Sequence, residues 1–334
     1  MNMGPAELMR ALQFEMPGDP KEVLRMRQLP RPEPGPGEVR LAMKLRPINP
    51  SDVLQVKGVY GRKPPLPAIA GLEGLGLVDA VGQGVTGYSI GQRVVPLGLQ
   101  GSWADYVVTT ADNLIAIPDG LSDEAAAQVI VNPLTAWIMA VEELKLGAGE
   151  WLVQTAAGSV VGRCLIQIAK LRGYKTLNLV RRPAQVAELL AEGADEVLCT
   201  EDPAWMDKAQ AIVGARGAAA GVDSVGGSLG GSVAMLLRRD GTLMVYGALS
   251  MDPLKVAGGQ LIFRTLTIRG FWLTDWKIRT PKPERDAIIN ALLEAMSKGQ
   301  ISPPVEAVFP LAEFQAAIEK ADEPGRSGKV LLAN

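Results

Sequence analysis

The amino-acid sequence predicts an α/β protein in which a β-rich domain accompanies a doubly wound parallel sheet of the Rossmann type. The chain has 334 residues, more than twice the roughly 100 to 150 residues of a usual single domain, so two domains are expected. From Glu150 onward, apolar strand-like runs alternate with helical patterns, as in a parallel sheet with crossover helices. The preceding part instead carries short strand-like runs between glycine and proline clusters.

The β-rich domain is predicted from four strand-like runs in the first part of the chain. These runs are EVRLAMKL, GLVDAVG, QRVVPL and ADYVV. The segment LPRPEPGPGEV is rich in proline and glycine, which favours a turn between two strands over a proline-rich binding ligand.

The Rossmann domain is predicted from six strand candidates that alternate with helices. The strand candidates are WLVQTAA, KTLNLV, EVLC, GVDSVGG, TLMVYGAL and TIRGFWL. After Thr280, the segments RDAIINALLEAMSKGQ and PLAEFQAAIEKADEP carry the apolar spacing of two amphipathic helices.

The overall composition is that of a folded globular protein. Hydrophobic residues make up 47% of the chain and charged residues 21%, and the formal net charge is -2, so a nucleic-acid partner is not expected. No run approaches the roughly 18 to 20 apolar residues that a membrane-spanning helix needs, so no membrane association is expected. Residues 1–14 lack the pattern of a secretory signal, and a cytoplasmic location is the expectation that follows.

The absence of histidine limits the chemistry more than any motif does. The chain contains no histidine, the most common metal ligand and general acid or base in proteins. Its two cysteines, Cys164 and Cys199, fall in a predicted helix and a predicted strand, where small buried side chains are common.

A candidate dinucleotide turn follows the first strand of the predicted parallel sheet. Ala157, Ser159 and Gly162 have the spacing of the three fingerprint glycines, and the turn should direct the first helix's N-terminus at a pyrophosphate. Two of the three glycines are replaced, and small residues at such a turn also serve plain packing, so the motif alone leaves both interpretations open.

Two arginines indicate which dinucleotide would bind. Arg181 and Arg182 directly follow KTLNLV, at the place where NAD-binding chains carry an acidic residue for the ribose 2′-hydroxyl. Two guanidinium groups suit a 2′-phosphate, so the sequence predicts NADPH. The alternative is a solvated basic turn.

Several tracts together resemble one known family. The tract RPINPSDVLQVKGVYGRKPPLPAIAGLEGLGLVDAVG and the segments VNPLTAW, GVDSVGG, TLMVYGALS, LIFRTLTIRGFWLTDW and RSGKVLLAN are similar to the zinc-free medium-chain dehydrogenases/reductases. Within that superfamily the chain resembles the 2-enoyl thioester reductases of the mitochondrial trans-2-enoyl-CoA reductase type, and also the quinone oxidoreductases. The resemblance implies a GroES-like catalytic domain over residues 1–128 and 280–334, a Rossmann domain over residues 129–279, and a homodimer joined through the Rossmann sheets.

The resemblance also implies that no catalytic zinc is bound. In the zinc alcohol dehydrogenases of the superfamily, a ligand cysteine stands where this chain has Asn49, and a ligand histidine stands where Leu72 precedes Glu73. The structural-zinc lobe needs four closely spaced cysteines, which this chain lacks.

The candidate site residues combine the residue patterns with this resemblance. Tyr60, in GVYGRKP, matches the catalytic tyrosine of the enoyl thioester reductases, and a phenol can donate a proton without histidine, although most tyrosines merely pack. Asn49 is the second catalytic candidate, with turn capping as the equal alternative. The cofactor-binding candidates are Asn132, Thr135, Ala157, Gly158, Ser159, Val160, Val161, Gly162, Arg181, Arg182, Tyr246, Gly247, Ala248, Phe271, Trp272 and Lys329.

The predicted activity is therefore NADPH-dependent reduction of the C2=C3 double bond of a 2-enoyl thioester. Two alternatives stay open at this point. One is an NADPH:quinone or enone oxidoreductase, which uses the same hydride delivery, and the other is an NADPH-binding protein without turnover.

Overall fold

The computed structural model describes residues 7–334, and these fall into two compact units. The first unit runs to Val131 and resumes at Pro303, and the second unit is Asn132–Ser302. Residues 1–6 lie outside the described residues, and they are part of the stretch 1–14 that lacks the pattern of a secretory signal. The second division lies later than the expected residue 280, because helix α11 (Lys282–Ser297) packs its apolar face against α4 (Asn132–Trp137) of the second unit.

The first unit is built mainly from antiparallel strands. Its larger sheet has seven strands in the order β15-β16-β3-β5-β6-β8, with β7 also paired to β3, and its smaller sheet has the order β2-β1-β4. The strands are β1 (Leu8–Phe14), β2 (Arg25–Pro30), β3 (Glu38–Pro47), β4 (Ala68–Ile69), β5 (Leu75–Val81), β6 (Arg93–Pro96), β7 (Tyr106–Thr110), β8 (Leu114–Ala116), β15 (Val305–Pro310) and β16 (Lys329–Ala333). The C-terminal segment thus completes the sheet that the N-terminal segment begins.

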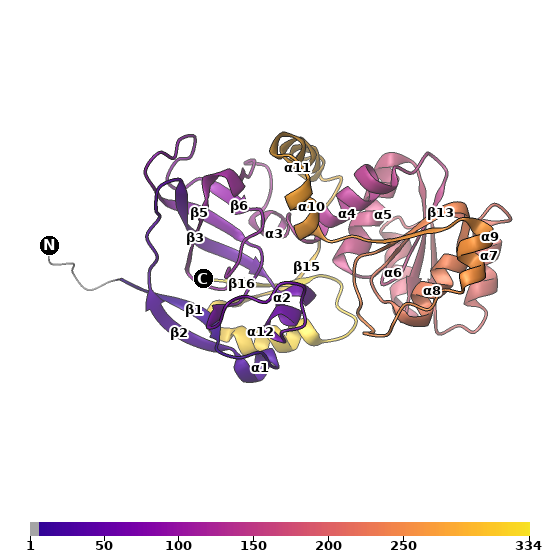
Figure 1. Cartoon of the computed structure of the whole chain (residues 1–334), viewed down its shortest axis with the longest axis horizontal. Helices are drawn as coiled ribbons and strands as arrows, with labels where there is room; N and C mark the ends of the chain where they lie inside the picture. Colours follow the sequence, from indigo (N-terminus) through magenta and orange to yellow (C-terminus); the bar gives the residue numbers. More distant parts are fainter. Residues whose placement is uncertain (1–6) are drawn as a thin grey trace. The chain divides into compact units, whose positions relative to one another are not determined.

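Short helices accompany the sheets of the first unit. They are α1 (Pro20–Val23), α2 (Pro50–Val56), α3 (Asp123–Ala127) and α12 (Phe314–Asp322), with 3-10 turns at Ala111–Asn113 and Leu311–Glu313. In Figure 1 the yellow helix α12 lies beside the indigo and purple helices α1 and α2, and Phe14, Trp103 and Phe314 share one apolar core there. Burial of these large side chains ties the two ends of the chain together.

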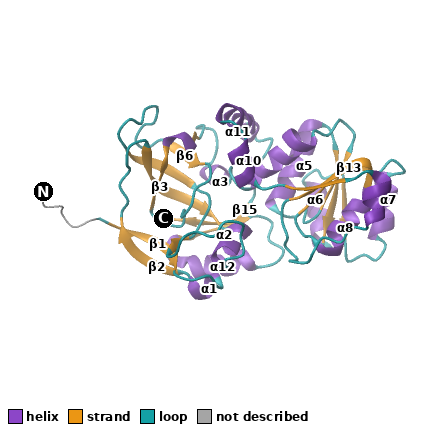
Figure 2. Ribbon diagram, viewed as in Figure 1, coloured by secondary structure: helices purple, strands orange, loops and turns teal. Residues whose placement is uncertain are grey.

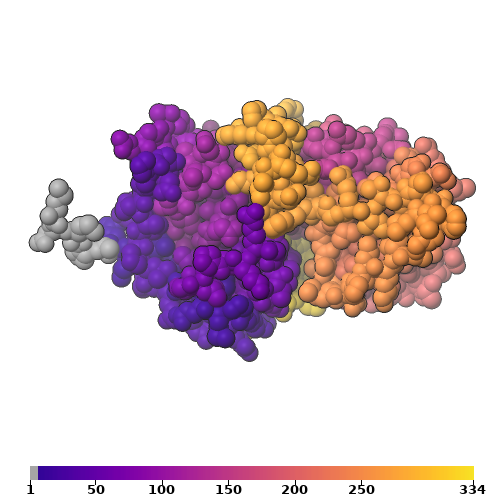
Figure 3. Space-filling model, in the orientation of Figure 1, coloured from indigo at the N-terminus to yellow at the C-terminus, as the bar shows by residue number. Residues whose placement is uncertain are grey.

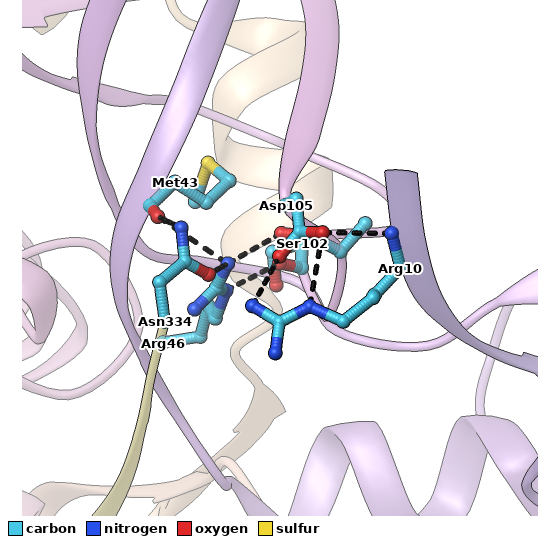
Figure 4. A network of polar contacts seen from close by, with 7 residues as sticks. Arg10, Met43, Arg46, Ser102, Asp105 and Asn334 are labelled. Atoms are coloured by element: carbon cyan, nitrogen blue, oxygen red, sulfur yellow. Dashed lines mark hydrogen bonds and ion pairs between the residues drawn. The ribbon is translucent and has the colours of Figure 1, made fainter. Parts of the chain in front are cut away.

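A buried arginine links the central strand of the larger sheet to the last residue of the chain. Arg46 is completely excluded from solvent, and its guanidinium donates to the carbonyl oxygens of Ser102 and Ala104 and to Oδ1 of Asn334 (Figure 4). The Asn334 Nδ2 atom in turn donates to the carbonyl oxygen of Met43. Burial lowers the pKa of Arg46 to about 9, which leaves the guanidinium charged at neutral pH.

The second unit is a parallel sheet with helices around it, which confirms the predicted Rossmann-type fold (Figure 2). Its strand order β11-β10-β9-β12-β13-β14 is that of a doubly wound dinucleotide-binding sheet, in which the order reverses between the first and fourth strands. The strands are β9 (Trp151–Gln154), β10 (Lys175–Val180), β11 (Glu196–Cys199), β12 (Ala218–Asp223), β13 (Leu237–Val245) and β14 (Thr267–Gly270).

The helices of the second unit follow the predicted crossovers. They are α4, a π-helix at Ile138–Leu144, α5 (Val160–Arg172), α6 (Ala184–Ala191), α7 (Trp205–Val213), α8 (Gly227–Leu236), α9 (Gly258–Arg264), α10 (Leu273–Arg279) and α11. Helix α9 exposes 70% of Ile262 and 77% of Phe263, and the orange residues of this part of the chain lie at the surface in Figure 3. None of the helices among the described residues is long and apolar enough to cross a membrane.

Candidate cofactor and catalytic sites

Most of the predicted cofactor residues lie where the parallel strands of the second unit end. The segment 157–162 follows β9, Arg181 and Arg182 follow β10, residues 246–248 follow β13, and Phe271 and Trp272 follow β14. Because the carboxyl ends of parallel strands share one edge of the sheet, these four segments lie along the edge where open α/β sheets bind ligands.

The turn after β9 has the backbone that a close approach to phosphate requires. Ala156 adopts a φ of 49°, and the Ser159 side chain caps α5 by accepting a hydrogen bond of 3.1 Å from the N–H of Gly162. A Cβ atom at Gly162 would lie 2.4 Å from the carbonyl oxygen of Ala157, so only glycine fits there. The N–H groups at the start of a thirteen-residue helix suit a pyrophosphate.

A buried aspartate organises the neighbouring turn after β12. The Asp223 carboxylate accepts hydrogen bonds from the Thr155 hydroxyl at 2.6 Å and from the backbone N–H groups of Val225 and Gly226. Asp223 is completely buried, and Thr155 follows directly on β9. This contact fixes the ends of the first and fourth strands at the point where the sheet order reverses.

Arg163 connects the dinucleotide turn with helix α6. Its Nε atom donates to the carbonyl oxygen of Gly158 at 3.2 Å, while its two terminal nitrogens pair with Glu188 of α6 and with Glu192, the residue that follows this helix. Only 2% of the Arg163 side chain is exposed. Helix α6 begins just after Arg181 and Arg182. The buried side chain of Arg163 therefore contacts both the dinucleotide turn and the helix that follows the two arginines.

The two predicted 2′-phosphate ligands lie at the start of the segment that leads into α6. Arg181 is exposed and Arg182 half-buried, and the Arg181 carbonyl oxygen accepts a hydrogen bond from the thiol of Cys199. The side chain of Gln185 lies against Gly158, where an added Cβ atom would come within 2.2 Å of its Nε2 atom. The turn and the arginine segment are therefore neighbours in the structure.

Tyr246 brings the end of β13 to the dinucleotide turn. Its hydroxyl is buried beside the side chains of Ser224 and Ser159, and this burial raises the pKa of Tyr246 to about 12. The following residue, Gly247, is packed so closely that an added Cβ atom would lie 3.0 Å from the Ser224 carbonyl oxygen. Tyr246 and Ser159, two residues predicted separately to bind cofactor, thus meet in the fold.

The remaining candidates of the second unit are less directly connected to the turn. Phe271 is 8% exposed, and Trp272 is the N-cap residue of α10. Asn132 and Thr135 are buried on α4, which packs against α5, the helix that the dinucleotide turn begins.

In the first unit, the predicted catalytic residue Asn49 is buried at the start of α2. It is 1% exposed; its Nδ2 atom donates to Oε1 of Glu73 at 2.7 Å, and its backbone N–H donates to Oδ2 of Asp52 at 2.7 Å. The capping box at this helix also has the Asn49 side chain accepting from the backbone N–H of Asp52. The geometry therefore gives Asn49 a helix-capping contact, and its catalytic role stays a prediction.

Asn49, Asp52 and Glu73 form a buried polar cluster with Lys329. Glu73 Oε2 accepts a hydrogen bond of 2.8 Å from the backbone N–H of Val131, and Lys329, the first residue of β16, is 6% exposed. Burial raises the pKa of Asp52 to about 7 and that of Glu73 to about 8, while the positive charge of Lys329 acts in the opposite direction on both.

Tyr60 lies in the loop between α2 and β4 and is half-buried. The start of this loop is anchored to the helix, because the backbone N–H of Val59 donates to the carbonyl oxygen of Leu54 at 3.0 Å. The position of Tyr60 is therefore tied to α2, whose other end is the capped Asn49.

The sequence patterns did not indicate several residues that shape these sites. Asp52, Glu73, Asp223 and Arg163 are buried charged residues, and the side chains of Glu73, Asp223 and Arg163 have partners that are distant in the sequence. A carboxylate ending the apolar strand in GVDSVGG was a usable signal for Asp223, but nothing local distinguishes Arg163. Among residues 7–334, no group of three or more histidine, cysteine, aspartate or glutamate side chains could hold a metal ion.

Known proteins resemble this chain over nearly its whole length. Residues 35–119 match the alcohol dehydrogenase GroES-like domain family, and residues 160–289 match the zinc-binding dehydrogenase family, although this chain lacks the zinc ligands described above. A mitochondrial enoyl-[acyl-carrier-protein] reductase of Arabidopsis thaliana is 38% identical, over 97% of this chain and 88% of the relative.

Solved structures agree with the fold. A protein of Bacillus thuringiensis described as an NADPH:quinone reductase superposes with a TM-score of 0.92 and 32% identity, over 98% of this chain and 99% of that one. The complex of Etr1p with NADP and crotonyl-CoA superposes with a TM-score of 0.87 and 26% identity, over 98% of this chain and 100% of that one.

These relatives overturn the expected cytoplasmic location. The Arabidopsis, Xenopus tropicalis and human relatives are all mitochondrial by name, which points to mitochondria. The expectation was wrong because composition and the lack of an apolar segment bear on membranes and secretion, and they carry no information that separates these two compartments.

Three observations indicate the same family. They are the similarity over nearly the whole chain, the pair of GroES-like and Rossmann-type sheets, and the candidate dinucleotide turn at the edge where the parallel strands end. The relatives are oxidoreductases, and a nicotinamide cofactor is the group that this family binds. The chain belongs to the medium-chain dehydrogenase/reductase superfamily, in the branch that contains the mitochondrial enoyl-[acyl-carrier-protein] reductases.

Proposed function

We propose that this protein reduces the C2=C3 double bond of a 2-enoyl thioester, carried on coenzyme A or on an acyl carrier protein, with NADPH. The observation that carries the proposal is the 38% identity to an enoyl-[acyl-carrier-protein] reductase over 97% of the chain. The similar Etr1p structure, which by name holds NADP and crotonyl-CoA, supports the same substrate class.

The second unit supports the choice of NADPH. The dinucleotide turn offers the N–H groups of α5 to a pyrophosphate, and Arg181 and Arg182 follow the second strand, where a 2′-phosphate would lie. Positions 181 and 182 hold no carboxylate, which would repel this phosphate. The residues of this chain therefore fit NADPH.

The first unit supplies the proton chemistry. A bound nicotinamide would supply the hydride, which goes to the β-carbon of the substrate. Tyr60 donates a hydrogen bond to the thioester oxygen, where negative charge develops, and the α-carbon receives its proton from the Tyr60 hydroxyl or from a water that it holds. Since the zinc-ligand positions hold Asn49 and Leu72, a hydroxyl donor takes the place of a Lewis acid.

We also propose that the protein forms a homodimer through the second unit. Strand β14 is an edge strand of the six-stranded sheet, and the nearby helix α9 exposes Ile262 and Phe263. An unpaired edge with large apolar side chains beside it suits pairing with a second copy. The Etr1p/Etr2p heterodimer is a dimeric structure to which this chain is similar.

The similar Bacillus thuringiensis structure favours a second candidate function, the reduction of quinones or enones with NADPH. This reaction uses the same cofactor site and needs no dedicated proton donor at an α-carbon. A third candidate, cofactor binding without turnover, is eliminated by any steady-state oxidation of NADPH.

A panel of steady-state assays tests the proposal. NADPH is supplied with crotonyl-CoA, with a longer enoyl-CoA and with a simple quinone, and the loss of absorbance of NADPH is followed. The proposal predicts that an enoyl-CoA has the highest kcat/KM. A quinone with the highest kcat/KM would establish the second candidate instead.

A further inference from the structure

Three ionisable side chains from distant segments are buried together in the first unit. Asp52 lies on α2, Glu73 precedes β5, and Lys329 begins β16, with exposures of 0%, 0% and 6%. Burying a carboxylate is costly unless hydrogen bonds and an opposite charge compensate. Because burying these groups costs free energy, we looked for a role of the cluster other than packing.

The hydrogen bonds of Glu73 show what the cluster holds. One oxygen accepts from the side-chain amide of Asn49 at 2.7 Å, and the other accepts from the backbone N–H of Val131 at 2.8 Å. Both partners are N–H donors, so a carboxyl group satisfies both with its two oxygens, whereas an amide at position 73 would turn an NH₂ group against one of them.

The two partners of Glu73 lie at structurally important places. Asn49 begins α2, and the far end of α2 anchors the loop that carries Tyr60. Val131 is the last residue of the first unit before the chain continues into the second unit. A single carboxyl group therefore fixes both the helix that precedes the catalytic candidate and the segment that leaves the unit.

Lys329 supplies the opposite charge. Its ammonium group favours ionisation of both Asp52 and Glu73, while Asp52 disfavours ionisation of Glu73. The positive charge of Lys329 therefore acts on both carboxyl groups of the cluster.

We propose that Glu73 is a positioning residue for the reduction: its carboxyl group holds Asn49 and Val131 so that α2 presents Tyr60 to the substrate. The role is one of alignment and not of contact with the reacting atoms. The kinetic meaning of this inference depends on the proposed function, but the placement of Glu73 does not.

The variant Glu73→Gln tests the proposal, and Glu22→Gln, at an exposed position of helix α1 in the same unit, is the matched control. For each variant, kcat is measured with whichever substrate of the panel the wild-type protein reduces best, and the dissociation constant of NADPH is measured by fluorescence titration. This choice keeps the test valid even if the enoyl-thioester assignment fails, because that failure is detected in the wild-type protein.

The expected result is a fall in kcat of at least about tenfold for Glu73→Gln, with the NADPH dissociation constant within about twofold of wild type. A kcat within about twofold of wild type overturns the proposal. So does a loss of NADPH affinity as large as the loss of kcat, because that pattern indicates general loss of structure.

Two further variants separate positioning from folding. If Glu73→Gln does not yield folded protein, Glu73→Asp is used, because it keeps the carboxyl group but is too short to reach both donors, and an intermediate kcat is expected. The double variant Glu73→Gln with Asn49→Ala should lose less than the product of the two single losses, since the two side chains act as a unit. Independent, multiplicative losses would contradict the proposal.

Discussion

The side-chain amide of Asn49 donates a hydrogen bond of 2.7 Å to the carboxylate of Glu73, and both residues are almost completely buried. Zinc-binding members of the superfamily use the position of Asn49 for a metal ligand. In this chain Asn49 belongs to a hydrogen-bonded network instead, and the proposed mechanism assigns the proton chemistry to Tyr60. Substitutions in the first unit test that division of roles, and substitutions in the second unit test the cofactor site.

Replacement of Tyr60 by phenylalanine should lower kcat for crotonyl-CoA at least about tenfold, equivalent to about 1.4 kcal/mol of transition-state stabilisation. The physical reason is the loss of the hydroxyl that donates to the developing charge on the thioester oxygen. Steady-state kinetics with NADPH measure the effect. The control is Tyr106→Phe, a half-buried tyrosine whose ring lies near Arg31 and Arg40, and it should remain within about twofold of wild type. Turnover of Tyr60→Phe equal to that of the control would remove Tyr60 from the mechanism.

The substitution Arg181→Ala should weaken NADPH binding far more than NADH binding. Replacing both Arg181 and Arg182 by alanine should weaken NADPH binding still more. Each charge-assisted contact with a phosphate contributes about 1.5 to 3 kcal/mol, and NADH lacks the 2′-phosphate. Dissociation constants for both cofactors are measured by fluorescence titration, with the exposed Arg216→Ala as control. An equal loss for NADPH and NADH would refute the 2′-phosphate assignment.

Replacement of Arg163 by methionine should weaken NADPH and NADH by similar factors, about tenfold or 1.4 kcal/mol. Arg163 holds the carbonyl oxygen of Gly158 and two carboxylates at α6, so its loss loosens the turn that both cofactors share. The same titrations measure it, with the exposed Arg239→Met as control. A loss confined to NADPH would show that Arg163 acts through the 2′-phosphate segment alone.

Replacement of Arg46 by methionine should destabilise the protein by about 3 kcal/mol, because the carbonyl oxygens of Ser102 and Ala104 lose a buried donor. Chemical denaturation measures the change in the free energy of unfolding. The control Arg27→Met removes an ion pair of exposed side chains and should change stability by less than about 0.5 kcal/mol. Equal effects of the two substitutions would mean that the buried network adds little.

The stability of the protein should fall as the pH rises from about 5 to 8. Burial raises the pKa of Asp52 to about 7 and of Glu73 to about 8, from ordinary values of 3.8 and 4.5, so the folded protein keeps protons that the unfolded chain releases in this range. Melting temperatures at several pH values measure the slope. Glu73→Gln should flatten it, whereas Glu22→Gln should keep it, and an unchanged slope in Glu73→Gln would show that Glu73 does not titrate there.

Much of the second unit follows from the sequence because its signals are local. Apolar strands that alternate with amphipathic helices predict the parallel sheet, and the rule that strand ends share one edge predicts that Ser159, Arg181 and Tyr246 lie along it. The same locality explains why the boundary expected at residue 280 differs from the division after Ser302, since the apolar face of α11 does not reveal which unit it covers until α4 is in place.

Residue identity and short-range spacing were enough to predict the α/β fold class and to show that the chain has no histidine, whereas the loss of the zinc ligands at Asn49 and Leu72 follows from the family resemblance. Tertiary packing alone brought Asp52, Glu73 and Lys329 into one cluster and placed Arg163 between the turn and α6. It also joined Arg46 to Asn334, which lies 288 positions further along the chain. No local pattern encodes these contacts, because the energy of a buried charge depends on its partners in space and not on its neighbours in the chain.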